Sequence, residues 1–291
     1  MLSAVPINKA FTFEVFEGCI TTLARQYPCL DVSVIGESHK GRPLYALTLG
    51  CGPVSYMYNA AHHANEWITA VILTKLVEDL AREVNPAWLS WAQGREPENK
   101  LQSPWYQRVT LHMVPMVNPD GVDMVIKGAS DWKANAVGVD LNSNYPAGWE
   151  LAKAHKYARG YATPGARDYV GPYPLSEPES LAMAAYTKLC NPALTLSFHT
   201  QGEVIYWRYR DYMPDGAADL ATQLSQASGY ELEDVPDESS HGGYRDWFIE
   251  SFNRPGFTIE CGLGESPLPL SDFDEIYKKT RPMMMGALHN S

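Results

Sequence analysis

Hydrophobic and polar positions follow two periods along the chain, one typical of helices and one typical of buried strands. Apolar residues recur three or four positions apart from Glu66 to Val84, which predicts a long helix that Asn85-Pro86 would end. Short apolar runs bounded by Gly and Pro predict strands. The predicted strands are Val32–Ile35, Leu44–Leu49, Ser55–Asn59, Val109–Val117, Leu194–His199, Val204–Tyr209 and Phe257–Glu260. The other predicted helices are Phe11–Tyr27, Glu177–Leu189, Asp215–Ser228, Gly243–Phe252 and Asp272–Leu288.

Strands and helices that alternate irregularly are typical of an α/β domain with a mixed sheet. No repeat, low-complexity tract or linker divides the 291 residues, so we expect one domain over residues 1–291. Two segments rich in Trp, Tyr, Gly and Pro, Pro86–Pro104 and Gly128–Gly171, are predicted to be long loops. Because loops of this length in a compact domain are commonly functional, we expect them to form the walls of a cleft.

The composition is that of a globular protein, with 45% hydrophobic and 20% charged residues. The net charge of −11 argues against nucleic acid and anionic membranes as partners, because both select clustered basic side chains. No apolar segment reaches the roughly 18 residues that a membrane span needs, and no signal peptide is recognisable. The five cysteines form no CxxC pair and suit a reducing compartment. We therefore expect a cytoplasmic protein.

His63 and Glu66 lie between a predicted strand and the long helix, and His199 ends another buried strand. A His and a Glu three residues apart can turn toward one ion, and their donor atoms suit Zn²⁺. The end of a strand is also where ligands bind in open α/β sheets. A set of two His and one Glu leaves a position for water, as in catalytic zinc sites. From the pattern alone, Glu66 could instead stabilise the helix dipole, and His199 could be a hydrogen-bonded core residue.

Glu260 ends the apolar strand Phe257–Glu260. Partial burial there would raise the pKa of its carboxyl toward that of a general base. A buried ion pair is an equally good interpretation of this residue from the pattern alone.

Five motifs follow one another in the order typical of zinc carboxypeptidases. They are the HxxE of 63–66, Asn118-Pro119-Asp120-Gly121, Gly138-Val139-Asp140-Leu141-Asn142, His199 and the TxE of Thr258–Glu260. The chain thus resembles the carboxypeptidase A-like family over nearly its whole length. The resemblance implies a single α/β domain whose eight-stranded mixed sheet is flanked by helices. It also implies one Zn²⁺ per chain, bound by His63, Glu66 and His199. Glu260 would be the general base.

Three further segments resemble bacterial γ-D-glutamyl-meso-diaminopimelate peptidases, a group that includes endopeptidase I and the murein peptide amidases. These segments are His62–Trp67, Phe198–Trp207 and Gly242–Phe248. The resemblance implies a substrate that is a murein peptide containing meso-diaminopimelate, cleaved at its γ-D-glutamyl bond. The endopeptidases often carry LysM wall-binding modules, and none is recognisable in this sequence. We therefore expect the enzyme to act on recycled muropeptides inside the cell.

Three family positions that contact the substrate differ in this sequence. The arginine that helps to clamp a terminal carboxylate follows Asn142 in digestive carboxypeptidases, and Ser143 stands there in this chain. The arginine that polarises the scissile carbonyl aligns with Lys133, whose ammonium can support an oxyanion without a bidentate grip. The substrate-binding tyrosine aligns with Glu238 in an ungapped count, and Tyr244 is the alternative.

Arg245 aligns with the family position at the floor of the specificity pocket. A buried arginine selects a carboxylate through paired, charge-assisted hydrogen bonds. Diaminopimelate has a second amino-acid head at the end of its side chain, so Arg245 could hold its carboxylate, and Asp246 or Glu238 its ammonium. The alternative interpretation of Arg245 is a surface residue at the start of a helix.

Two other functions stay open from the sequence. Arg245 would equally suit a metallocarboxypeptidase for acidic C-terminal residues, although the absence of Arg beside Asn142 argues against it. A catalytically silent muropeptide-binding protein is the other alternative. The intact ligand set and Glu260 argue against that function, and metal analysis would test it.

Overall fold

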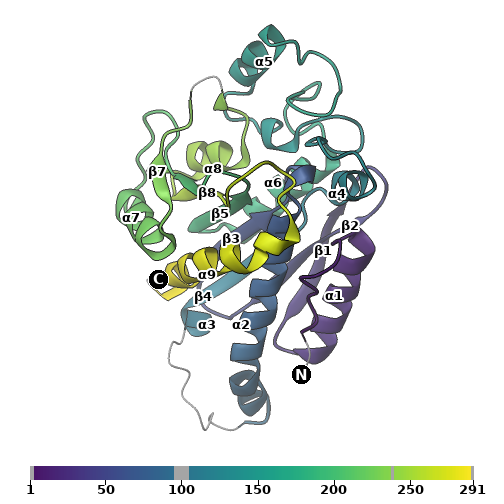
Figure 1. Cartoon of the computed structure of the whole chain (residues 1–291). Helices are drawn as coiled ribbons and strands as arrows, with labels where there is room; N and C mark the ends of the chain where they lie inside the picture. The colour runs from purple at the N-terminus through teal and green to yellow at the C-terminus, as the bar shows by residue number, and fades with distance from the viewer. Residues whose placement is uncertain (1–2, 95–104, 237–238, 290–291) are drawn as a thin grey trace.

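An eight-stranded mixed sheet forms the centre of the protein in a computed structural model that describes residues 3–94, 105–236 and 239–289 (Figure 1). Its strands are β1 (Asp31–Glu37), β2 (Pro43–Leu49), β3 (Val54–Ala60), β4 (Val109–Val114), β5 (Leu194–His199), β6 (Val204–Tyr206), β7 (Glu231–Glu233) and β8 (Gly256–Glu260). Their order across the sheet is β1-β2-β4-β3-β5-β8-β6-β7. The central strands β4, β3, β5 and β8 are parallel, whereas β1, β2 and β6 pair antiparallel with a neighbour.

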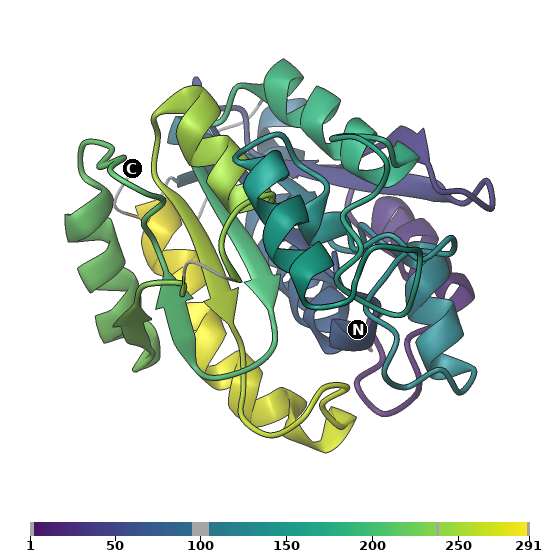
Figure 2. The same ribbon diagram turned by 90° about the horizontal axis from the view of Figure 1, so that it is seen from above.

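Helices cover both faces of this sheet (Figure 2). The first face is covered by α1 (Phe13–Gln26), α2 (Ile68–Ala92) and α9 (Phe273–His289), with α7 (Ala217–Ser228) packed on α9. The second face is covered by α6 (Pro178–Cys190) and α8 (Tyr244–Phe252). Further helices lie in the connections: η1 (Ala64–Glu66), α3 (Trp105–Arg108), α4 (Pro119–Ile126), η2 (Leu141–Ser143), α5 (Trp149–Ala158) and η4 (Leu270–Asp272).

The sheet confirms the predicted fold, a single α/β domain with eight strands in a mixed sheet flanked by helices. Strand β5 shows why the sequence pattern was informative. Every one of its residues is buried because helices cover both faces of the sheet, and three large apolar residues, Leu194, Leu196 and Phe198, alternate along it with polar ones.

Proline affects two predicted elements differently. Pro86 does not end the long helix, because α2 continues through it to Ala92. Val84 and Ala87 are both buried, so packing on either side of the proline offsets the hydrogen bond that it removes. Strand β4, in contrast, ends at Val114 and not at Val117, since Pro115 has no N–H for the ladder. Strand β6 is also shorter than predicted.

Two predicted loops contain helical structure. Residues 86–92 of the segment Pro86–Pro104 belong to α2, and residues 95–104 lie outside the described residues. Helix α5 lies within Gly128–Gly171. Helix α4 was not predicted, although the Asn118 side chain accepts a hydrogen bond from Gly121 N–H and Pro119 occupies the first turn, which are both helix-start signals.

Among the described residues, no helix combines the length and the apolar character that crossing a membrane would require. The apolar side of α2 packs into the core of the domain, together with α1 and α9.

Candidate active site

The carboxyl ends of three adjacent parallel strands bring the candidate ligands and the candidate base together. His199 and Glu260 are the last residues of β5 and β8 and lie directly opposite each other in register. His63 precedes η1 and Glu66 ends it, just after strand β3. The ligand cluster therefore lies at the sheet edge where α/β proteins bind their ligands.

His63, Glu66 and His199 place their donor atoms around one point. The two Nδ1 atoms of the histidines lie 3.2 Å apart. The Glu66 carboxylate lies 2.8 Å from His63 Nδ1 and 2.9 Å from His199 Nδ1. On the far side of the His63 ring, Nε2 lies 3.3 Å from Asp140 Oδ1, and such a carboxylate orients metal-binding histidines. Two imidazole nitrogens and a carboxylate that converge in this way fit a zinc site.

The charges around His63 explain why this cluster suits a cation. Burial alone would lower the pKa of His63, but the carboxylates of Glu66 and Asp140 raise it to about 9. Burial would raise the pKa of Glu66, but His63 and Lys133 hold it well below its usual value. In the metal-free protein a proton on His63 therefore balances the buried carboxylates. A divalent cation can replace that proton.

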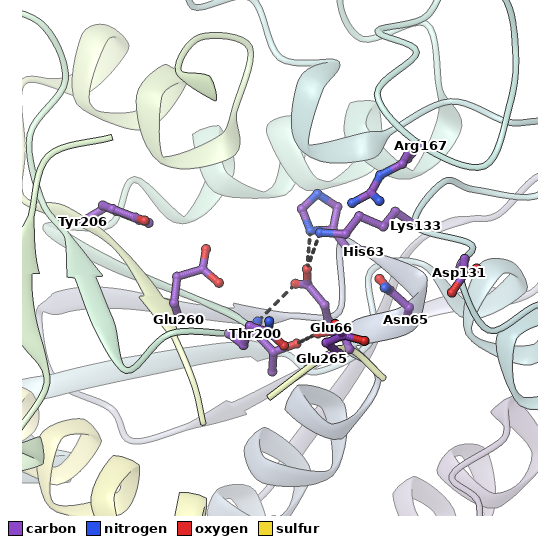
Figure 3. A pocket seen from close by; sticks show the side chains of 12 residues that line it. His63, Asn65, Glu66, Asp131, Lys133, Arg167, Thr200, Tyr206, Glu260 and Glu265 are labelled. Atoms are coloured by element: carbon purple, nitrogen blue, oxygen red, sulfur yellow. Dashed lines mark hydrogen bonds and ion pairs between the residues drawn. The ribbon is translucent and has the colours of Figure 1, made fainter. Parts of the chain in front are cut away.

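Two cavities meet at the ligand cluster. The first, which we call the Lys133 cavity, has a volume of about 490 Å³ and is lined mainly by charged and polar side chains (Figure 3). The second, the Arg245 cavity, has a volume of about 330 Å³. His63, Tyr206 and Glu260 line both cavities, so a bound chain that occupies the two would cross the cluster where they join.

Glu260 faces the cluster across the Lys133 cavity, with His63, Lys133 and Arg167 on the opposite side (Figure 3). Burial and the charge of Glu66 raise the pKa of Glu260 to about 8, although Lys133 acts in the opposite direction. A divalent cation in the cluster would favour its ionised form. This carboxyl can therefore exchange a proton near neutral pH.

Lys133 is fixed against the cluster by its side chain and its backbone. Its Nζ lies 3.1 Å from Glu66 Oε1. Its carbonyl accepts a hydrogen bond from Ala64 N–H at 3.0 Å, and its N–H donates to Ala166 O at 2.7 Å. The ammonium therefore lies beside the ligand cluster on the wall of the cavity.

Arg245 is only 5% exposed, so its interpretation as a surface residue is wrong. Its Nε donates to Asp246 Oδ1 at 3.0 Å, and its Nη2 donates to the same oxygen. The buried Nη1 has no hydrogen-bond partner within the described part of the chain. Because Arg245 and Asp246 both line the Arg245 cavity, Nη1 can donate a hydrogen bond to a ligand that enters it.

Asp246 is the counter-ion of Arg245. Its second oxygen, Oδ2, accepts a hydrogen bond from His241 N–H at 3.1 Å. Both carboxylate oxygens are thus engaged inside the protein. The expectation that Asp246 or Glu238 holds the ammonium of the substrate stays a prediction, and Asp246 would have to do so with oxygens that already accept hydrogen bonds.

Tyr244 does not reach either cavity, which corrects its expected role in substrate binding. The residue is fully buried, and its hydroxyl is hydrogen-bonded to Thr187 Oγ1 at 2.9 Å. Its backbone N–H donates to Asn142 Oδ1 at 3.0 Å, and Asn142 itself lines the Arg245 cavity. Glu238, the other candidate for this role, lies outside the described residues.

Two cavity residues were not found from the sequence. Tyr206 ends β6 and lines both cavities, and its ring lies 6.0 Å from the Arg245 guanidinium carbon. Arg167 lines the Lys133 cavity from the long connection between α5 and α6. The position of Tyr206, an aromatic residue near the end of a predicted strand, was a weak signal for a cavity residue. Arg167, a single basic residue in a predicted loop, gave no signal.

The fold and the cluster agree with comparisons to known proteins. The chain belongs to the zinc carboxypeptidase family, whose profile matches residues 17–283, and it is a zinc metallopeptidase of this family. γ-D-Glutamyl-L-diamino acid endopeptidase 1 of Lysinibacillus sphaericus is 38% identical over 302 residues, which cover 97% of this chain and 73% of that protein.

Two solved structures share the fold at low sequence identity. Bovine thrombin-activatable fibrinolysis inhibitor has a TM-score of 0.78 at 19% identity, covering 98% of this chain and 97% of that one. The murein-tripeptide amidase of Escherichia coli O157 has a TM-score of 0.56 at 22% identity, covering 87% and 91% respectively. These likenesses concern the arrangement of the backbone.

Proposed function

We propose that the enzyme hydrolyses the amide bond between the γ-carboxyl of D-glutamate and meso-diaminopimelate in murein peptides. The observation that carries this proposal is the buried Arg245, which lines a cavity beside Glu260 and whose Nη1 is unpaired among the described residues. The second head group of diaminopimelate bears a carboxylate that can accept from this nitrogen. The named activity of the Lysinibacillus relative, on γ-D-glutamyl-L-diamino acid bonds, supports the same substrate class.

The proposed metal ligands are His63, Glu66 and His199, which would bind one Zn²⁺ per chain. Bound there, zinc would supply Lewis-acid polarisation of the scissile carbonyl and would make an attacking water more acidic. Asp140 contributes by holding the His63 ring in position through Nε2.

Glu260 is the proposed general base. It faces the point where the two cavities meet, so it can take a proton from the attacking water and deliver it to the leaving amine of diaminopimelate. Lys133 places a fixed positive charge on the opposite wall, where it can stabilise the oxyanion that develops on the carbonyl.

Each of the two cavities would hold one half of the substrate. The diaminopimelate half would occupy the Arg245 cavity, where Asn142, whose Oδ1 accepts from Tyr244 N–H, could donate from Nδ2 to the carboxylate next to the scissile bond. The D-glutamyl half would then lie in the Lys133 cavity.

Every cysteine of the chain is a free thiol, which supports action on soluble muropeptides in a reducing compartment.

A hydrolysis assay tests the proposal. Zinc-loaded protein is incubated with L-Ala-γ-D-Glu-meso-diaminopimelate, and mass spectrometry should detect L-Ala-D-Glu and free diaminopimelate. The Glu260→Gln variant is the control for contaminating peptidases. Cleavage of peptides with a C-terminal Glu or Asp, but not of the tripeptide, would identify an acid-specific carboxypeptidase instead. Binding of the tripeptide without cleavage of either substrate would identify a silent binding protein.

A further inference from the structure

We infer that Arg167 binds the free α-carboxylate of the D-glutamyl residue and so selects a γ-linked glutamate on the acyl side of the scissile bond. This inference rests on the proposed function, because only a γ-linked substrate carries that group. In a γ-glutamyl bond the chain runs through the side-chain carboxyl. The α-carboxylate is therefore a charged branch on the carbon that lies three carbon–carbon bonds from the scissile carbonyl carbon, and it must enter the Lys133 cavity with the substrate.

Apart from the candidate ligand His63, Lys133 and Arg167 are the basic side chains among the described residues that line this cavity. The ammonium of Lys133 is already engaged with Glu66 Oε1 at 3.1 Å. Among the described residues, Arg167 has one long ion-pair contact, from Nε to Asp168 Oδ2 at 3.5 Å, and its side chain is 49% exposed. Its terminal nitrogens point toward the cavity (Figure 3). They can therefore hold a carboxylate through two parallel hydrogen bonds.

The backbone on both sides of Arg167 is anchored to the active site. Ala166 O accepts a hydrogen bond from Lys133 N–H at 2.7 Å. Asp168 N–H donates to Asp140 Oδ2 at 3.3 Å, and the same carboxylate orients one of the ligand histidines. The position of Arg167 is thus set relative to the ligand cluster, although it lies in a long connection between helices.

A second residue of the Lys133 cavity, Asn65, suits another group on the α-carbon of the D-glutamyl residue. The α-carbon of the D-glutamyl residue carries an amide N–H, where L-alanine is attached, as well as the carboxylate. Asn65 lines this cavity, is 5% exposed, and has an amide oxygen without a hydrogen-bond partner in the ranges that the structure describes. It can accept from that N–H. The exposed carboxylates of Asp131 and Glu265 line the cavity too and would repel the anion without Arg167.

The test compares two substrates that differ only at this carboxylate. One is L-Ala-γ-D-Glu-meso-diaminopimelate, and the other carries D-isoglutamine, whose α-carboxylate is an amide. We expect the unmodified enzyme to prefer the carboxylate by about tenfold in kcat/KM, mainly through KM, as one charge-assisted hydrogen-bonded pair is lost. Arg167→Gln should reduce this preference to near one, and Arg167→Lys should keep part of it because the charge remains.

Arg159→Gln is the matched control, because this substitution removes the same charge from the same connection. Arg159 is exposed, and its side chain contacts the ring of Tyr161. This variant should leave the preference unchanged, and all variants should keep one zinc per chain by elemental analysis. Equal cleavage of both peptides by the unmodified enzyme would overturn the role of Arg167 and leave the proposed function intact. A preference that persists in Arg167→Gln, or an equal loss on both substrates, would also overturn it. Zinc-loaded enzyme that cleaves neither peptide would contradict the proposed function itself.

Discussion

Replacing meso-diaminopimelate by L-lysine in the tripeptide should strongly reduce hydrolysis. Lysine has the same chain and the same terminal ammonium, but it lacks the distal carboxylate. Arg245 Nη1, which is buried and unpartnered among the described residues, then gains no acceptor from the substrate. The comparison therefore isolates the interaction on which the proposed substrate depends.

The size of the effect follows from the pairing of Arg245 with Asp246. Because Asp246 already neutralises the guanidinium, the lysine peptide does not leave a bare buried charge. It loses one charged hydrogen bond, a contribution of about 1.5–3 kcal/mol. Since about 1.4 kcal/mol corresponds to a factor of ten, kcat/KM should fall by roughly 10- to 150-fold.

The same pairing determines which variant to use. Arg245→Ala would leave Asp246, which is 4% exposed, as a buried carboxylate without its counter-ion, at a cost of about 3–5 kcal/mol. The double variant Arg245→Gln/Asp246→Asn removes both charges and nearly preserves the side-chain sizes. It should cleave the diaminopimelate and lysine peptides with similar efficiency. Asp246→Asn alone is the control and should keep a preference for diaminopimelate.

The assay measures kcat/KM for both peptides by mass spectrometry, with zinc content determined for each variant. Equal efficiency of the unmodified enzyme on the two peptides would refute the role of Arg245. The assignment to the zinc carboxypeptidase family would be unaffected.

Three further predictions concern the ligand cluster and the base. His63→Ala should abolish zinc binding in elemental analysis, whereas His289→Ala, at an exposed helix end, should retain it; stoichiometric zinc in the first variant would refute the ligand assignment. Glu260→Gln should keep zinc but lower kcat by about 100-fold or more, and near-normal turnover would assign the base elsewhere. In metal-free protein, folding raises the pKa of Glu260 from 4.5 to about 8. Because the unfolded chain then loses this proton at a lower pH than the folded protein, the free energy of unfolding should fall as pH rises between these values. Glu260→Gln should therefore be more stable than the unmodified protein at pH 8 and equal to it near pH 4.5 in urea unfolding, and a difference independent of pH would contradict this account.

Local patterns located seven of the eight strands, all except β7 (Glu231–Glu233), and indicated the candidate ligand set. The pattern at Leu194–His199 predicted a buried strand, which is β5. His63, Glu66 and His199 could be proposed as a set because two are three residues apart and the third ends a strand. The sheet edge brings such residues together in any α/β domain of this kind. The order of the motifs along the chain is by itself typical of the zinc carboxypeptidase family.

The substrate cavities depended on contacts between distant segments. Tyr244 and Arg245 are neighbours at the start of α8, yet one is in the core and the other lines a cavity. Successive helix residues point in different directions, and the packing of α8 on β5 and β8 decides which of them faces the ligand. Arg167 lines the Lys133 cavity because its segment is anchored there, in part by Ala166 O, which accepts from Lys133 N–H, 33 positions earlier in the chain. No local pattern encodes such a hydrogen bond, since its formation requires the rest of the domain to bring the two segments together.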